Sequence, residues 1–178
     1  ECENKLDRIK TICEKVKGSG LVYVKSRKKT SDIAEYLCQH NINADFYHAG
    51  LDPKIRTIKQ DDWKMGRTRI MVCTNAFGMG IDRSDVRFVA HFDIPGSIEA
   101  YYQEAGRAGR DGEPSYCELF YNFADTKTQD FFIDGNNPSY EIICDIYNTL
   151  RKHADLSHEV KLSIDDIAKT ANVKNSMA

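Results

Sequence analysis

The chain has 178 residues, of which 41% are hydrophobic and 29% are charged, a balance typical of a globular protein rather than a disordered one. No stretch approaches the ~20 consecutive apolar residues of a membrane helix, and we expect no signal peptide. The net charge of −2 excludes a protein that coats nucleic acid with a uniformly basic surface, so any such contact must come from a few placed cations and backbone amides.

Helical and extended patterns alternate along the first 125 residues, which is typical of a parallel sheet covered by helices. Apolar residues recur at helical spacing over residues 4–17, and Gly18-Ser19-Gly20 predicts the end of that helix. A short apolar run predicts a buried strand at 21–24. Residues 30–32 (Thr-Ser-Asp) predict the cap of a second helix, and Asp52-Pro53 predicts the start of a third.

The remaining elements of this region follow the same alternation. Ser97 predicts the cap of a helix through Tyr101 and Tyr102. Further strands are predicted at 44–48, 69–74, 86–92 and 115–121. Five strands with intervening helices indicate one three-layer α/β domain, a parallel sheet flanked by helices, over residues 1–125.

Beyond residue 125 the pattern becomes helical. Asn137-Pro138 predicts the start of a helix to about Lys152, and Ser163 with Asp166 predicts a capping box for a helix over 164–171. We therefore expect a short helical C-terminal extension over 126–178. Its last helix is either the start of a truncated winged-helix or helix-turn-helix region or a plain terminal helix.

The cysteines are scattered and form no Cys-x-x-Cys pair; they are Cys2, Cys13, Cys38, Cys73, Cys117 and Cys144. Metal ligation needs clustered thiolates, and a disulfide framework is typical of small secreted chains. We therefore expect no metal site, and buried free thiols in a reducing cytoplasm.

Two of the predicted strands are followed by segments that could contact phosphate. Residues 24–29 carry a hydroxyl and several cations, which suit a phosphate backbone, although a solvated basic turn has the same composition. In residues 74–82, Gly78 and Gly80 allow backbone amides to approach a bound group, and Thr74 adds a hydroxyl. A tight turn is the alternative interpretation of this second segment.

The strongest chemical signal is the segment 101–112, in which glycines at 106, 109 and 112 alternate with Arg107 and Arg110. Close-packed guanidinium groups bind phosphate bidentately, and such arginines neutralise the charge that develops on a transferred γ-phosphoryl group. The chain contains no Gly-x-x-x-x-Gly-Lys-Ser/Thr phosphate loop and no Asp-Glu pair after a strand to hold magnesium. We therefore expect the chain to be part of a longer protein and these arginines to face a nucleotide held elsewhere.

Taken together and in order, five segments resemble the C-terminal motor domain of RecQ-family DNA helicases over roughly residues 15–125. They are Tyr23–Arg27 (YVKSR), Tyr47–Leu51 (YHAGL), Ala76–Asp82 (AFGMGID), Val86–Pro95 (VRFVAHFDIP) and Tyr101–Gly112 (YYQEAGRAGRDG). The second, third and fifth are far more specific together than alone. DEAD-box RNA helicases share the general order, but their last motif usually opens with a histidine where this chain has Tyr-Gln.

The resemblance implies a RecA-like fold and the second of two motor lobes of an ATP-dependent, 3′-to-5′ DNA helicase of superfamily 2. It implies that Arg110 is the arginine finger, that Arg107 is a second γ-phosphate contact, and that Gln103, Gly80 and Asp82 border the ATP. Six positions match residues that line the single-strand track: Ser26, Arg27, His48, Arg56, Thr74 and Asn75. Such contacts are mostly to the sugar-phosphate backbone, as a translocase blind to sequence requires.

The resemblance also implies the ligands and partners. ATP and Mg²⁺ would be held mainly by an N-terminal RecA-like lobe that this chain lacks, so the chain alone should be inactive. The expected partners are that lobe, single-stranded DNA and duplex-junction DNA, in DNA repair and recombination, with no membrane. Many RecQ proteins continue into a four-cysteine zinc module, but only Cys144 follows Cys117 here, so we expect no zinc. The expected location is the cytoplasm, at the nucleoid of a bacterium, or the nucleus of a eukaryote.

Two other functional classes stay open from the residues themselves. One is a non-catalytic nucleic-acid-binding domain that uses the RecA-like fold without turnover. The other is a dinucleotide-dependent enzyme, whose glycine fingerprint should follow the first strand, where Lys25-Ser26-Arg27 stands instead.

Overall fold

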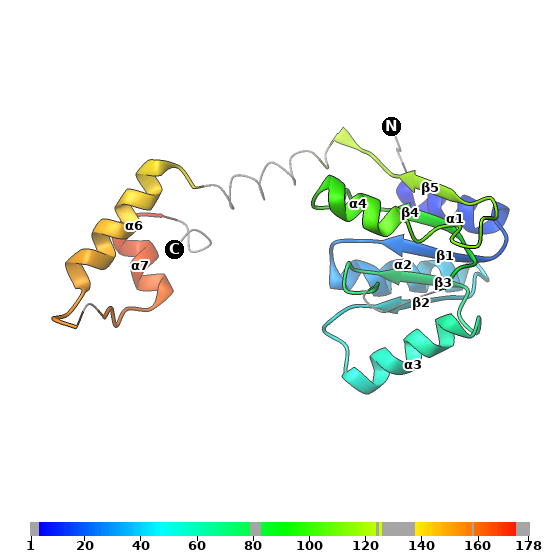
Figure 1. Cartoon of the computed structure of the whole chain (residues 1–178), viewed down its shortest axis with the longest axis horizontal. Helices are drawn as coiled ribbons and strands as arrows, with labels where there is room; N and C mark the ends of the chain where they lie inside the picture. The colour runs from blue at the N-terminus through cyan, green and yellow to red at the C-terminus, as the bar shows by residue number, and fades with distance from the viewer. Residues whose placement is uncertain (1–3, 79–82, 124, 126–137, 158, 174–178) are drawn as a thin grey trace. The chain divides into compact units, whose positions relative to one another are not determined.

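The computed structural model describes residues 4–78, 83–123, 125, 138–157 and 159–173. The chain divides into two compact units, residues 1–125 and residues 126–178 (Figure 1). The first unit holds a β-sheet with its covering helices, and the described part of the second unit contains two helices.

A five-stranded parallel sheet forms the centre of the first unit, with the strand order β2-β3-β1-β4-β5 (Figure 1). Its strands are β1 (Ser19–Tyr23), β2 (Ala44–Tyr47), β3 (Ile70–Cys73), β4 (Val86–His91) and β5 (Tyr116–Leu119). The inner strands β1 and β3 are buried along their whole length, which explains their continuous apolar sequence. The edge strand β5 is largely exposed. All five predicted strands are confirmed, each within about two residues of its expected bounds.

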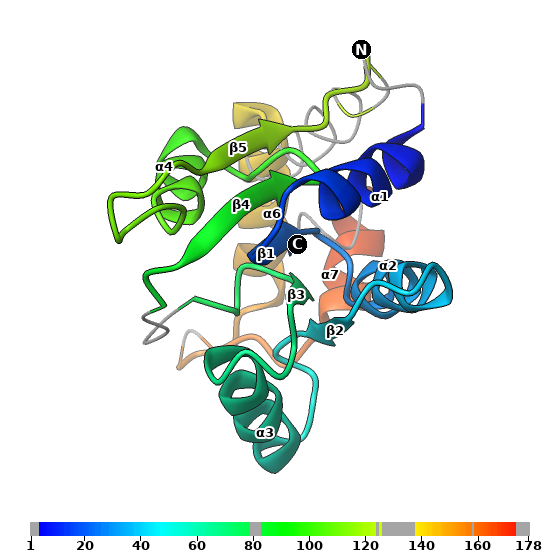
Figure 2. The same cartoon turned by 90° about the vertical axis from the view of Figure 1, so that its right-hand side faces the viewer.

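Helices cover both faces of this sheet, so the predicted three-layer α/β architecture is confirmed. Figure 2 shows α1 (Lys5–Lys15) and α2 (Arg27–Gln39) on one face, and α3 (Pro53–Lys64) and α4 (Ile98–Ala105) on the other. Because successive strand residues point to opposite faces, the core has two clusters. Val22 and Phe88 pack with α1 and α2, whereas Leu21 and Val89 share a cluster with Trp63 of α3.

The predicted start of α2 is wrong by about one turn. The hydroxyl of Ser26 accepts a hydrogen bond from the backbone N–H of Lys29 at 3.5 Å, so Ser26 is the N-cap and the helix begins at Arg27. Thr30 and Ser31 lie inside the helix, and their hydroxyls donate to carbonyl oxygens three residues earlier instead of accepting from amides. The basic residues of the predicted loop 24–29 therefore lie mostly in the first turn of a helix.

The second unit contains α6 (Tyr140–His153) and α7 (Ile164–Ala171). The helix α6 begins later than Asn137-Pro138 predicts, because the Ser139 hydroxyl accepts from the N–H of Ile142 at 3.4 Å and makes Ser139 the cap; Asn137 lies outside the described residues. The bounds predicted for α7 are confirmed. Ser163 caps it, and the left-handed Asn172, with φ of 55°, ends it.

The five described cysteines are free, but the expectation that they are buried holds only in part. Cys13 and Cys73 are buried, and burial raises the pKa of the Cys13 thiol to about 12. Cys38 and Cys117 are exposed. Cys38 lies near the end of α2, and Cys117 lies on the edge strand β5.

Candidate functional site

Three neighbouring strands carry the predicted nucleic-acid residues at their carboxyl ends. His48 follows β2, Thr74 and Asn75 follow β3, and Ser26 with Arg27 follows β1. Parallel strands end at the same edge of a sheet, and these three are adjacent in the order β2-β3-β1. The five residues therefore lie in a row across one sheet edge. The sixth, Arg56, is in the first turn of α3, the helix that follows β2.

The members of this row differ in how much side chain they present. Ser26, Arg27 and Asn75 are exposed, and His48 and Arg56 are partly buried. Thr74 is only 8% exposed, and its backbone N–H donates to the carbonyl of Tyr47 at 3.2 Å. Asn75 therefore offers the accessible side chain of the Thr74-Asn75 pair.

His48 and Arg27 come together over Gly50. A Cβ atom at Gly50 would lie 2.9 Å from Arg27 Nη1 and 3.3 Å from His48 Nδ1, so the absence of a side chain lets both groups approach. Burial, followed by the charges of Arg27 and Lys59, lowers the pKa of His48 below its ordinary value. A neutral imidazole at this place acts as a hydrogen-bonding group rather than a cation. Its Nδ1 is buried and has no hydrogen-bond partner among the described residues.

Arg27→Ala is expected to raise the pKa of His48, because it removes a cation that disfavours the protonated ring. The folded-state pKa of His48 lies below the unfolded value of about 6.5, so the unfolded chain binds more protons in mildly acidic solution. His48 therefore contributes a loss of stability as the pH falls below that value, and the loss should shrink in the variant. NMR titration of the imidazole measures the change. Lys28→Ala, which removes an exposed neighbouring cation, is the control, and an equal shift in both variants would contradict the pairing.

A cavity of about 280 Å³ opens at the same sheet edge, between the ends of β1 and β4. Asn75, Asp93, Ser97 and Glu104 contribute to its lining, together with the backbone that follows β1. The chain leaves β1 towards β2 but leaves β4 towards β5, so the cavity lies at the point where the sheet connections diverge. Open α/β sheets bind ligands at such points.

Asp93 is already neutralised at the rim of this cavity. Lys29 Nζ pairs with its carboxylate at 2.8 Å, and the backbone N–H of Lys25 donates to the same group at 2.9 Å. An anionic ligand would therefore meet little repulsion from Asp93.

The segment 101–112, which carries Arg107 and Arg110, does not lie at the carboxyl end of a strand as the starts of the segments 24–29 and 74–82 do. It follows the helix α4 rather than a strand, and the N–H of Gly109 donates to the carbonyl of Val86, the first residue of β4, at 2.9 Å. The row of predicted nucleic-acid residues lies at the carboxyl ends of the strands. The arginine segment thus runs back beside the sheet to the amino end of β4.

Arg107 is held by the backbone of the segment 74–78. Its Nη1 donates to the carbonyl of Gly78 at 2.9 Å, and a Cβ atom at Gly78 would lie 2.3 Å from Arg107 Nη2. The sequence predicts a bound group close to Gly78, but the group found there is the side chain of Arg107, from the same unit. The Nε atom of Arg107 is buried and has no partner among the described residues. Gly80 and Asp82, predicted to border a nucleotide, lie outside the described residues.

Arg110 is exposed, and its Nε donates to the carbonyl of Gly106 at 3.1 Å. Together with Arg83 and Arg107 it lines a cavity of only about 10 Å³, whose lining also includes Trp63 and Phe77. Arg83 is paired with Asp85, and guanidinium groups gathered at one point of the surface suit the oxygens of an anionic group. The remaining predicted residue, Gln103, is exposed near the end of α4.

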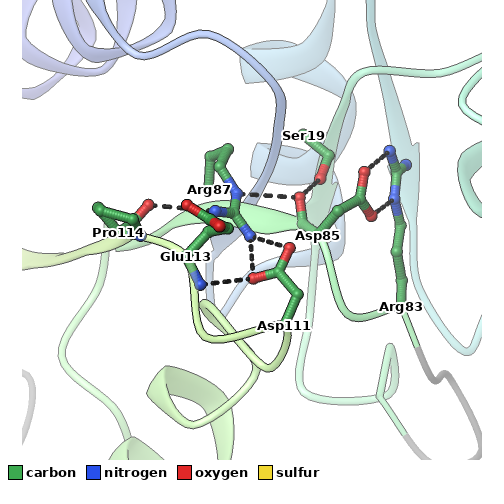
Figure 3. Close-up of polar contacts among 7 residues, drawn as sticks. All are labelled: Ser19, Arg83, Asp85, Arg87, Asp111, Glu113 and Pro114. Carbon is green, nitrogen blue, oxygen red and sulfur yellow. Dashed lines mark hydrogen bonds and ion pairs between the residues drawn. The ribbon is translucent and has the colours of Figure 1, made fainter.

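The sequence alone did not identify the acidic residues that pair with basic side chains in this region. Asp111 accepts two hydrogen bonds from Arg87, and Asp85 binds Arg83 (Figure 3). A third pair joins the buried His91 to Glu104 of α4 at 2.9 Å. The two partners in the first and third pairs are 24 and 13 residues apart, so no local spacing signals them.

Within the described part of the chain, no group of three or more His, Cys, Asp or Glu side chains is placed to hold a metal ion. None of the helices described there combines the length and the apolar character needed to cross a bilayer.

Comparison with known proteins gives consistent matches. The family described as the helicase conserved C-terminal domain matches residues 4–112. The ATP-dependent DNA helicase RecQ of Haemophilus influenzae is 52% identical over 107 residues, which is 60% of this chain and 17% of that protein. The ATP-dependent DNA helicase Q5 of Rattus norvegicus is 45% identical over 116 residues, 65% of this chain and 12% of that protein.

Among solved structures, a single-residue variant of S. cerevisiae Dbp5, bound to RNA and ADP-BeF3, matches with a TM-score of 0.64 and 23% identity, over 75% of this chain and 37% of that one. This likeness concerns the fold alone, and it agrees with the RecA-like architecture. The chain spans about a quarter or less of the length of the curated relatives that it matches.

Proposed function

Since this chain belongs to the family of helicase conserved C-terminal domains and is similar to RecQ-type helicases, we propose that it is the second motor lobe of an ATP-dependent DNA helicase. In this proposal the whole protein moves 3′-to-5′ along single-stranded DNA and separates duplexes at junctions. The lobe supplies Arg110 as the arginine finger and Arg107 as a second γ-phosphate contact. Such a protein acts where cellular DNA lies, in a nucleoid or a nucleus.

The observation that carries the proposal is the cavity lined by Arg107 and Arg110. These guanidinium groups suit an anionic ligand, but the chain has no phosphate loop to hold a nucleotide by itself. A nucleotide clamped between this lobe and a first lobe accounts for both facts. Magnesium would be held with the nucleotide by the first lobe, so we expect the isolated chain not to hydrolyse ATP.

The row of residues at the sheet edge supports the nucleic-acid part of the proposal. Ser26, Arg27 and Asn75 are exposed across the adjacent ends of β1 and β3, with His48 at the end of β2. Hydroxyl, amide and guanidinium groups in one row suit the repeating phosphates and sugars of a single strand. The few cations and the net charge of −2 favour local backbone contact over broad electrostatic binding.

Strand separation by the full-length protein tests this function. In the presence of ATP and Mg²⁺ we expect it to unwind a DNA duplex with a 3′ single-stranded tail and to leave one with a 5′ tail intact. A non-hydrolysable ATP analogue is the control and should support binding without unwinding. Binding of single-stranded DNA without ATP turnover would instead identify a non-catalytic binding domain, and preference for a 5′ tail would overturn the assigned direction.

A further inference from the structure

The ten residues after α4 form a loop whose shape depends on a few side chains. Residues 106–115 contain no helix or strand, and glycines with positive φ stand at 109 and 112. The backbone is fixed at Gly109, whose N–H bonds to the start of β4, and a turn follows in which the N–H of Gly112 donates to Gly109. Arg110 lies inside this turn. Its Nε donates to the carbonyl of Gly106 at 3.1 Å, so the conformation of the turn decides where the Arg110 side chain lies.

Asp111 is the residue that ties this turn to the sheet (Figure 3). Arg87 Nη2, on β4, donates to the two carboxylate oxygens of Asp111 at 2.5 and 2.6 Å. The N–H of Glu113 donates to the same carboxylate at 3.1 Å. The side chains of Arg87 and Asp111 are only 17% and 27% exposed, so solvent screens the pair less than an ordinary surface ion pair. The hydrogen bonds from Arg87 lower the pKa of Asp111, which therefore stays ionised.

Arg87 is itself fixed from two sides. Its Nη1 donates to the carbonyl of Pro114 at 3.3 Å, beyond the turn, and its Nε donates to the carbonyl of Asp85 at 3.4 Å, before β4. The carbonyl of Asp85 also accepts from the hydroxyl of Ser19 at the start of β1. A single guanidinium group thus joins Asp111 in the turn and Pro114 beyond it to the residue that precedes β4.

The network continues to the floor of the arginine cavity. The Asp85 carboxylate accepts from Arg83 Nε at 2.6 Å and from Nη2 at 3.0 Å. Arg83 lies over the ring of the buried Trp63 at 4.9 Å and donates to its carbonyl. Arg83 and Arg110 line the same cavity. Two acidic residues, Asp85 and Asp111, therefore pair with the supporting arginines, Arg83 and Arg87.

We propose that Asp111 is a positioning residue for Arg110: its attachment to Arg87 fixes the direction from which the Arg110 guanidinium reaches a nucleotide. The inference rests on the proposed function, and it adds a role for an acidic residue that does not touch the nucleotide. Without the ion pair between Asp111 and Arg87, Arg110 is still present, but its side chain approaches the nucleotide from a different direction. A misplacement of about 1 Å can cost roughly a hundredfold in rate.

The test measures DNA-stimulated ATP hydrolysis by the full-length protein with Asp111→Asn. We expect kcat to fall by about ten- to a hundredfold, with KM for ATP nearly unchanged, because the lost interaction matters in the transition state. Arg87→Gln should have the same effect, and the two changes together should cost little more than either one. Asp62→Asn, on α3, breaks a more exposed ion pair with Arg67, outside the loop 106–115, and should leave kcat unchanged.

Combining Asp111→Asn with Arg110→Ala separates positioning from a purely structural role. If Asp111 acts through Arg110, Asp111→Asn should cause no further loss once Arg110 is absent. An equal loss in both backgrounds, or a wild-type kcat for Asp111→Asn alone, would overturn the inference. If Asp111→Asn does not fold, Asp111→Glu keeps the charge but lengthens the tether, and wild-type kcat in that variant would also overturn it. Failure of the proposed function looks different, because Arg110→Ala alone would then leave hydrolysis intact.

Discussion

Replacing Arg110 by alanine in the full-length protein is expected to lower kcat for DNA-stimulated ATP hydrolysis by about 10³- to 10⁵-fold, the effect typical of an arginine finger. A guanidinium group that contacts the transferred phosphoryl stabilises charge that appears only in the transition state. Affinity for ATP should therefore change far less than turnover. Steady-state hydrolysis with saturating single-stranded DNA measures kcat, and nucleotide binding measured separately gives the affinity.

A matched control comes from the same lobe. Arg67 is a surface arginine, 61% exposed and paired with Asp62, so Arg67→Ala removes the same side chain at a position that does not line the cavity. That variant should keep full activity. Arg110→Lys provides a second comparison, since lysine keeps the charge but loses the planar fork, and it should restore only a small part of the rate. Near-normal hydrolysis by Arg110→Ala would show that the finger assignment is wrong.

Trp63→Ala should have the largest effect on stability, lowering the free energy of unfolding by about 3–5 kcal/mol. The Trp63 side chain is 1% exposed and meets Phe77 edge to face, with ring centres 5.4 Å apart, while Arg83 covers its other side. Truncation leaves a cavity beneath the arginine site that the parallel sheet cannot collapse to fill. Urea denaturation followed by circular dichroism measures the loss, since Trp63 is the one tryptophan of the chain and its fluorescence disappears with it.

Two variants of the same helix make this result interpretable. Ile58 is 59% exposed on α3, so Ile58→Ala should change stability by no more than about 0.5 kcal/mol. Trp63→Phe keeps an aromatic ring and removes an indole N–H that is buried without a partner among the described residues, so it should cost clearly less than Trp63→Ala. A loss below about 1 kcal/mol for Trp63→Ala would contradict the role of Trp63 as a core anchor.

Much of the fold could be predicted because local patterns agree with the tertiary structure. The strands β1 and β3 read as apolar runs because they are buried on both faces, and Asp52-Pro53 and Ser163 cap helices as their chemistry dictates. The start of α2 could not be settled in this way. Ser26 and the group Thr30-Ser31-Asp32 are all possible caps, and only the position of β1 decides among them.

The candidate site was predictable in its parts but not in its arrangement. The sequence indicated Arg107 and Arg110 through their glycine spacing, and the row at the sheet edge through its place after the strands. It did not indicate that Gly78 would accept a hydrogen bond from Arg107, because the two are 29 residues apart. The ion pair of Arg87 and Asp111 could not be predicted either, because the two residues are far apart in the sequence. Such long-range pairs depend on strand order and on the path of the loop.

The hydrogen bond between Arg107 and Gly78 joins the arginine segment to the short stretch of backbone that begins at Asn75. Three peptide links, roughly 10 Å of chain at full extension, separate Gly78 from Asn75 at the sheet edge. Between them the carbonyl of Phe77 is held by the hydroxyl of Tyr23, which leaves this segment very little slack. An anion that draws the Arg107 guanidinium away would remove this hydrogen bond from the Gly78 carbonyl, three residues from Asn75. Only three peptide links of backbone therefore separate the residue that holds Arg107 from the row at the sheet edge.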